Sequence, residues 1–240
     1  MPPGASPDPR ALASLPPGDP AQLLYAAGAA LAVDAIPVAG GWLLRTPDAP
    51  LALTEAVWDP EAARVAELAE GCAAHGVRPA VLTTGPGAVE DALAQLGWAP
   101  SCGVALDPAR DPNVPSGGPR PDAGAVRLGW DGAGEVAREI ADAHALPDAA
   151  ASLATLLASA TAADDRVRLL SETGDAGARA VCVVVEDDAS AVVLLTAGPA
   201  EALVARTLAA ARGLGKRTGW AHATAADAAD AVVWRWEPAT

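Results

Sequence analysis

The segment that decides the fold is residues 166–197, RVRLLSETGDAGARAVCVVVEDDASAVVLLTA. It contains three runs rich in β-branched and aliphatic residues, at 166–172, 179–186 and 190–197, separated by short stretches rich in Gly, Asp and Ala. Apolar runs of this length between turn residues predict consecutive antiparallel strands. The segment therefore predicts a three-stranded antiparallel meander in the second half of the chain.

Helices and further strands are expected on both sides of this meander. Pro147 should stop one helix and Asp148 should cap the next, because proline cannot continue a helix and aspartate accepts hydrogen bonds from its first amides. The predicted order is a strand at 125–130, helices at 134–146 and from 148, the meander, a helix at 199–215, a strand at 218–224, and a helix at 225–236 that can finish as a strand.

The first half of the chain predicts the order β-β-α-β-α-β. Two strands, at 40–46 and 51–58, flank the turn residues Pro47 and Asp48, so we expect a hairpin there. The elements that follow are a helix capped at Asp59 and ended by Gly76, a strand at 79–84, a helix at 88–97 and a strand at 98–107.

Two proline-rich stretches predict the domain boundaries. Residues 1–20 contain seven prolines, and residues 107–124, DPARDPNVPSGGPRPDAG, contain five. Neither stretch can sustain a helix or a sheet ladder. We therefore expect a flexible tail at 1–19, an N-terminal domain at 20–106, a linker at 107–124 and a C-terminal domain at 125–240.

The two halves also resemble each other at an offset of 139 residues, which indicates a duplication. A one-residue deletion near the end extends the match to the Trp and Pro of WAP and WEP, Trp98 on Trp236 and Pro100 on Pro238. The gapless matches place Pro60 on Pro199, Ala63 on Ala202, Val65 on Val204, Ala66 on Ala205, Gly76 on Gly215, Arg78 on Arg217, Asp91 on Asp230 and Ala92 on Ala231.

Composition excludes several classes of partner. The 240 residues carry 16 basic and 30 acidic side chains, a formal charge of −14, so nucleic acids and anionic membranes are poor partners. The longest uncharged apolar stretch, Ala21 to Val33, is too short to span a bilayer. The N-terminus lacks the cationic and apolar regions of a secretory signal, so we expect a cytoplasmic protein.

Cysteine and tryptophan are both expected to be packing residues. Cys72, Cys102 and Cys182 are widely spaced and lack a C-x-x-C pair, which disfavours a disulfide framework and a zinc site and favours buried thiols. The chain has seven Trp and no Phe, so Trp should fill the large core positions.

The predicted element order of the second half resembles that of the GNAT superfamily of acetyl-CoA-dependent N-acetyltransferases. The sequence AARGLGKRTGWAHAT (210–224) is similar to the long helix of that family turning through Gly into its fifth strand. DALAQLGW (91–98) is similar to the closing helix with its Gly-aromatic pair. The resemblance implies an α/β (α+β) fold with two GNAT-like mixed, mostly antiparallel sheets flanked by helices, arranged in tandem, with an incomplete first copy.

The resemblance also implies a cofactor, acetyl-CoA, and the place where it binds. The family holds the pyrophosphate of CoA on backbone amides of an Arg/Gln-x-x-Gly-x-Gly/Ala loop at the start of the long helix. In this chain the strand runs into GPAEALVARTL (198–208), so Thr196, Ala197 and Gly198 are the candidate cofactor-binding residues and the loop is eroded. In an alternative register, RGLGKR (212–217) would form the loop instead. The first copy has Asp59 and Glu61 at this place, which repel an anion.

Catalysis would need a proton acceptor, and His222 is the candidate base, because the matching family strand borders the acceptor cleft. The Tyr that serves as general acid in the family has no counterpart in the last helix, and the only Tyr of the chain is Tyr25. The implied function is acetyl transfer from acetyl-CoA to a small amine. The alternative is a pseudoenzyme, a non-catalytic GNAT-fold module that binds a protein partner or forms a homodimer. No metal site is predicted.

Overall fold

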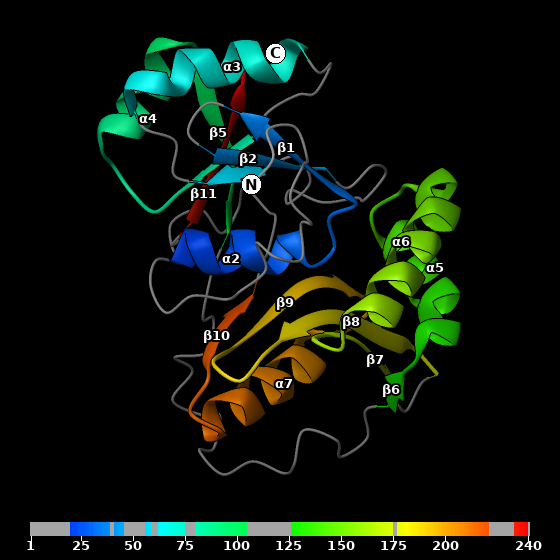
Figure 1. Ribbon diagram of the computed structural model, residues 1–240. Coiled ribbons are helices and arrows are strands. Elements are labelled where there is room, and N and C mark those ends of the chain that lie inside the picture. The colour runs from blue at the N-terminus through cyan, green and yellow to red at the C-terminus, as the bar shows by residue number, and fades with distance from the viewer. Residues whose placement is uncertain are drawn as a thin grey trace. The chain divides into compact units, whose positions relative to one another are not determined.

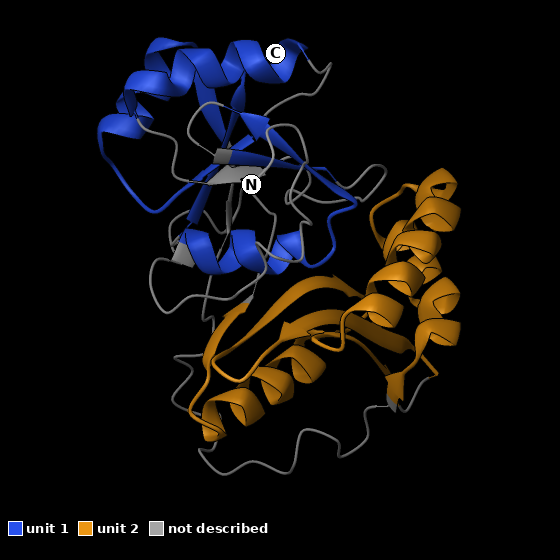
Figure 2. Cartoon of the chain, viewed as in Figure 1, with its two compact units in different colours: residues 1–46, 52–106, 222–240 blue, residues 47–51, 107–221 orange. Residues whose placement is uncertain are grey.

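The computed structural model describes residues 20–38, 41–45, 56–58, 62–74, 80–104, 126–174, 177–220 and 233–239. The chain forms two compact units, which Figure 2 shows in different colours. Unit 1 comprises residues 1–46, 52–106 and 222–240, and unit 2 comprises 47–51 and 107–221. Within the described part of the chain the protein is mixed α/β with six α-helices, and none of these helices is long and apolar enough to cross a membrane.

Unit 2 contains the predicted meander and confirms the order of elements around it (Figure 1). Its sheet has the strand order β10-β9-β8-β7-β6, with antiparallel pairing from β6 to β9 and parallel pairing of β9 with β10. The elements are β6 (Val126–Leu128), η2 (Trp130–Gly132), α5 (Ala133–Ala143), η3 (Pro147–Ala149), α6 (Ala150–Ala163), β7 (Val167–Thr173), β8 (Arg179–Glu186), β9 (Ser190–Ala197), α7 (Glu201–Gly213) and β10 (Arg217–Trp220).

Both faces of the unit 2 sheet are buried. Cys182 and Val184 of β8 and Val193 of β9 pack against α7 in one apolar cluster. The alternate residues of β8, Val181 and Val183, are as deeply buried on the opposite face, where α5 contacts the strands. The near-continuous apolar sequence of β8 follows from this two-sided burial.

The helix before α6 ends differently from the prediction. α5 ends at Ala143, and the amide of Leu146 donates to the carbonyl of Ala141 at 2.8 Å, which is the 6→1 hydrogen bond of a Schellman motif. Ala145, inside this motif, has a φ of 55°. Asp148 does not cap α6, since a 3₁₀ turn covers Pro147–Ala149 and no side chain caps the helix.

Unit 1 places helices on both sides of its strands, with α3 and α4 opposite α2 (Figure 1). A two-stranded sheet, β1-β2, lies beside a four-stranded sheet with the order β3-β4-β11-β5. The elements are α2 (Pro20–Ala29), β1 (Asp34–Val38), β2 (Gly41–Arg45), β3 (Ala56–Trp58), η1 (Ala62–Arg64), α3 (Val65–Ala74), β4 (Ala80–Thr83), α4 (Ala88–Gln95), β5 (Trp98–Val104) and β11 (Val233–Pro238).

The predicted hairpin around Pro47 is wrong. β2 pairs antiparallel with β1, with Pro37 opposite Trp42, while β3 pairs in parallel with β4. Only two residues separate β1 from β2, and such a short connection favours antiparallel pairing over the longer one to β3. Neither α2 nor β1 was anticipated from the sequence.

The predicted C-terminal domain boundary is also wrong. β11 lies between β4 and β5 of unit 1, so the end of the chain does not belong to the domain predicted at 125–240. The predicted tail at 1–19 and linker at 107–124 lie outside the described residues, as do residues 225–232 of the predicted last helix.

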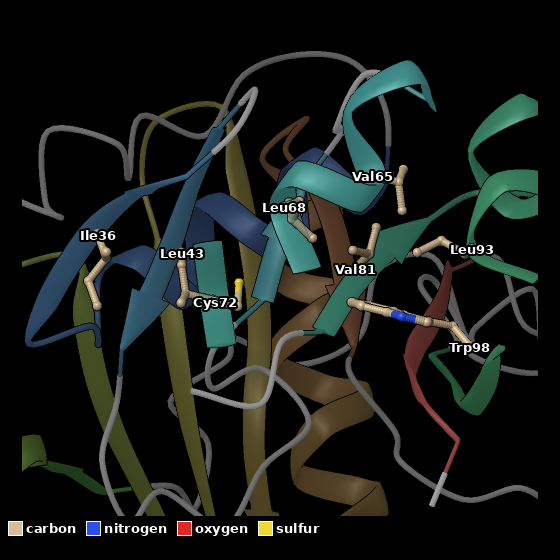
Figure 3. Close-up of a cluster of buried hydrophobic side chains, with 8 residues drawn as sticks. All are labelled: Ile36, Leu43, Val65, Leu68, Cys72, Val81, Leu93 and Trp98. Atoms are coloured by element: carbon tan, nitrogen blue, oxygen red, sulfur yellow. The ribbon is translucent and has the colours of Figure 1, made fainter. Parts of the chain in front are cut away.

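The cores of the two units confirm the burial predicted for Cys72, Cys182 and Trp98. Figure 3 shows Cys72 of α3 and Trp98 of β5 in one cluster with apolar side chains of β1, β2, β4 and α4. Cys72 and Cys182 are buried and neither forms a disulfide; the side chain of Cys102 is outside the described part. Among the tryptophan side chains that the structure describes, Trp98 is buried and Trp130 is 67% exposed. The other three, Trp42, Trp234 and Trp236, are partly buried.

Candidate functional site

The candidate cofactor-binding residues lie together at the end of β9, where the chain turns into α7. Ala197 and Thr196 pair with Val181 and Cys182 of β8, and the side chain of Thr196 is partly exposed. Leu195 and Ala197 are buried, which leaves Thr196 as the side chain of this strand end that a ligand could reach.

β9 contains a bulge just before these residues. Val183 pairs with Leu195 while the next residue, Val184, pairs with Val193, so Leu194 has no partner on β8. The described part of β10 pairs with β9 from Ser190 only to Val193. An unpaired extra residue bends a strand, and bulges of this kind often adjoin active sites. No signal in the sequence LL (194–195) indicated it.

Gly198 is required by close packing. Its φ is +70°, and a Cβ atom at this position would clash with the carbonyl oxygen of Arg179. The carbonyl of Gly198 accepts a hydrogen bond of 2.8 Å from the amide of Ala200, the N-cap of α7. Glycine is the residue that tolerates both the conformation and the contact.

The charges around the start of α7 do not favour an anion. Glu201 is exposed in the first turn of the helix. Its carboxylate already neutralises the positive end of the helix dipole, so it would repel a second anion there. Arg206, further along α7, forms an ion pair with Glu172, and Arg179 pairs with Glu135. Both of these arginines are therefore already paired with carboxylates.

Cys182 lies opposite Thr196 but cannot act as a nucleophile. Its side chain is fully buried, and this burial raises the pKa of the thiol to about 12. Since the thiolate is the reactive form, Cys182 is inert at neutral pH.

The alternative register, with RGLGKR as the loop, is wrong. Residues 201–213 form α7, so Arg212 belongs to the last turn of a helix and its Nε donates to Thr218 Oγ1 at 3.1 Å. Gly215, with a φ of 78°, follows the C-cap of that helix. The segment ends a helix and does not begin one.

Two of the three histidines lie outside the described residues. They are His222, the candidate base, and His75. His144 is the C-cap of α5, and partial burial lowers the pKa of its imidazole.

A partly buried ion network at the other end of β9 was not predicted. Glu186 binds Lys216 through one carboxylate oxygen and Arg168 through the other, each at 2.6 Å. Lys216 is the only lysine in the chain, which is the signal that could have drawn attention to it. The neighbouring Asp187 accepts hydrogen bonds from the amides of Ala189 and Ser190, so this acidic hairpin tip is a structural turn.

The loop between β4 and α4 is a turn. Gly85 has a φ of 154°, and Gly87 is the N-cap of α4. Glu90 and Asp91 follow in the first turn of the helix, where they disfavour a phosphate. Among the described residues no group of His, Cys, Asp and Glu is suited to hold a metal ion.

The chain matches no family model, no curated protein and no solved structure.

Proposed function

We propose that this protein is a GNAT-like acetyltransferase that transfers an acetyl group from acetyl-CoA to a small amine. The observation that carries the proposal is the sheet of unit 2, in which a bulged β9 lies between antiparallel β8 and parallel β10 and leads into α7. From β6 to β10 the order of strands and helices agrees with the one that the resemblance in sequence implies, and the final helix of that order lies outside unit 2. The bulge supports a ligand site at the strand end.

The end of β9 suits the thioester arm of acetyl-CoA better than the start of α7 suits its nucleotide end. At the bulged end of β9, Thr196 is partly exposed, and the described part of β10 pairs with β9 no further than Val193. In this proposal an extended amide-containing arm pairs with the strand there. The start of α7 carries Glu201, which disfavours the pyrophosphate. The proposal therefore includes weak binding of the nucleotide end and orientation of the thioester arm by β9. Acetyl-CoA supplies an activated acetyl group when bound.

His222 is the proposed base that accepts the proton of the amine. It follows Trp220, the last described residue of β10, by two positions in the sequence. It is also the first residue of the segment 222–240 that belongs to unit 1, so its role as a base rests on the resemblance alone. His222→Ala should lower kcat at least tenfold, within the range of general base catalysis, and leave the affinity for acetyl-CoA unchanged. His144→Ala, at the end of α5, is the matched control and should retain full activity.

The first experiment is thermal unfolding with and without millimolar acetyl-CoA. A ligand at about 100 times its Kd adds about 2.7 kcal/mol to the stability of the native state, which raises Tm by several degrees in a chain of this size. Thr196→Trp should abolish the shift by filling the strand end, whereas Thr155→Trp, at an exposed position of α6, should retain it. Release of CoA thiol with a panel of amines then tests turnover.

A non-catalytic binding module is the second candidate, and the charge at the start of α7 favours it. Glu201 in the first turn and the ion pair of Arg206 with Glu172 are features expected of a helix that no longer receives a phosphate. This candidate predicts no change in Tm with acetyl-CoA and none with acetyl-pantetheine. A shift with acetyl-pantetheine alone would favour the acetyltransferase with a donor that lacks the nucleotide.

A further inference from the structure

The last strand of the chain completes the sheet of unit 1. β11 pairs antiparallel with β4, with Trp234 opposite Thr83, and antiparallel with β5 along its length. Val233 is fully buried and Arg235 is 7% exposed. Trp236 packs against the core cluster of unit 1, and its Nε1 donates to Thr83 Oγ1 at 3.1 Å. β11 is therefore a central strand, held on both edges.

The pairing of β5 with β11 is symmetric in a way that the sequence repeat explains. Trp98 lies opposite Pro238, Pro100 lies opposite Trp236, and Ala99 lies opposite Glu237. In the repeat, Trp98 corresponds to Trp236 and Pro100 to Pro238. Each tryptophan thus lies opposite the proline of the other copy. A local two-fold axis that passes between Ala99 and Glu237 relates the two pairs.

This register is that of an isologous interface. When two equivalent strands pair antiparallel about a two-fold axis, the same surface serves both partners, as it does between the subunits of a symmetric dimer. The ladder extends one step further, because the amide of Ala239 donates to the carbonyl of Gly97 at 3.1 Å. A bulge at Ser101, opposite the step from Arg235 to Trp236, ends the symmetric part.

From this geometry we propose that the slot between β4 and β5 is a docking site for a C-terminal strand, and that a second copy of this chain can supply that strand. The donor strand is separated in the sequence from the other strands of unit 1 by the whole of unit 2. Both of its edges are held by main-chain hydrogen bonds that any chain of the same sequence can make. Exchange of an identical element preserves every contact, so it costs little apart from association.

Two full-length variants with complementary defects test the proposal. Val233→Asp puts a carboxylate at a fully buried position of β11 and spoils the donor. Leu82→Asp does the same on β4 and spoils the acceptor. When the two variants are refolded together, β11 of the Leu82→Asp chain should fill the intact slot of the Val233→Asp chain. The expected result is a 1:1 heterodimer with twice the chain mass of 23.8 kDa, in which unit 1 of the Val233→Asp chain is complete.

The controls separate exchange from general misfolding. Ala239→Asp, at an exposed position just past β11, replaces Val233→Asp as the matched control and should yield no dimer with Leu82→Asp beyond that of wild type. If the aspartate variants aggregate, Val233→Ala and Leu82→Ala take their place. A synthetic peptide of residues 229–240 added to Val233→Asp should raise its Tm. Absence of the heterodimer on mixing, by light scattering after size exclusion, would overturn the proposal.

Discussion

Glu201 has the clearest individual effect on the proposed site. Its carboxylate lies in the first turn of α7, where a charge interacts with the helix dipole by about 0.3–1 kcal/mol. Glu201→Gln removes the repulsion of a phosphate, so the Kd for acetyl-CoA should fall by a factor of about two to five. Isothermal titration calorimetry at low ionic strength measures the change, which should shrink at 0.5 M salt.

Glu70→Gln is the control for this experiment. Glu70 is exposed on α3 in unit 1, so the substitution changes the net charge equally without altering the start of α7. If both variants improve binding equally, the effect arises from the net charge of −14 and not from Glu201.

Single residues also show the limits of reading this site from sequence. Gly198 could be anticipated, because a Gly-Pro pair after an apolar run is typical of a turn between a strand and a helix. The bulge at Leu194 could not, since leucine has no preference for bulges and the shift arises from how β8 and β9 pair. The ion pairs of Arg206 and Lys216 depend on contacts 34 and 30 residues apart in the sequence.

At the scale of elements, α5 and α7 end in the same motif but with different residues at the left-handed position. In α7 this residue is Gly215, whose amide donates to Arg212, and in α5 it is Ala145, whose amide donates to Asp142. Ala145→Gly should stabilise the protein and Gly215→Ala should destabilise it, each by about 1 kcal/mol, because only glycine adopts this conformation without strain.

Calorimetry measures both effects, as changes of Tm of about 2–4 °C in opposite directions. Gly213→Ala, within the last turn of α7, is the matched control, because helical backbone favours alanine. A loss of stability in Ala145→Gly would mean that the entropy of the unfolded chain outweighs the relief of strain.

The elements that could be predicted are those with strong local patterns. The meander β7 to β9 and the helix α7 follow from uninterrupted apolar runs with clear turn residues. The pairing of β2 could not be predicted, because two strands compete for it and β3 is three residues long. The parallel pairs β3–β4 and β9–β10 support the duplication, but their registers differ by three residues from the offset of 139.

At the scale of the whole molecule, the single lysine makes chemical labelling informative. Lys216 is 13% exposed and bound to Glu186, so an amine-reactive acetylating reagent should modify the N-terminal amine and leave Lys216 intact in the native state. Loss of this charged hydrogen bond in Glu186→Gln should increase the rate of Lys216 modification about tenfold. Intact-protein mass spectrometry counts the acetyl groups.

Glu172→Gln provides the comparison, because Glu172 pairs with Arg206 and not with the lysine. Its labelling should match that of the wild-type protein. Rapid modification of Lys216 in the wild-type protein would contradict the partly buried ion network around Glu186.

The division of the molecule into units could be predicted only in part. A boundary between the strands β5 and β6 follows from the prolines of 107–124. The return of β11 to unit 1 could not, because a strand with alternating Val, Arg and Trp suits either sheet and its choice depends on long-range pairing.

The position of β11 reverses the order in which the molecule can mature during translation. Synthesis proceeds from the N-terminus, and domains usually fold in that order as they emerge from the ribosome. Here all described strands of unit 2 have been made by residue 220, whereas β11, the strand that fills the gap between β4 and β5, is made only after them. Unit 2 is therefore complete first, and the half of the protein that is translated earliest is the last to close.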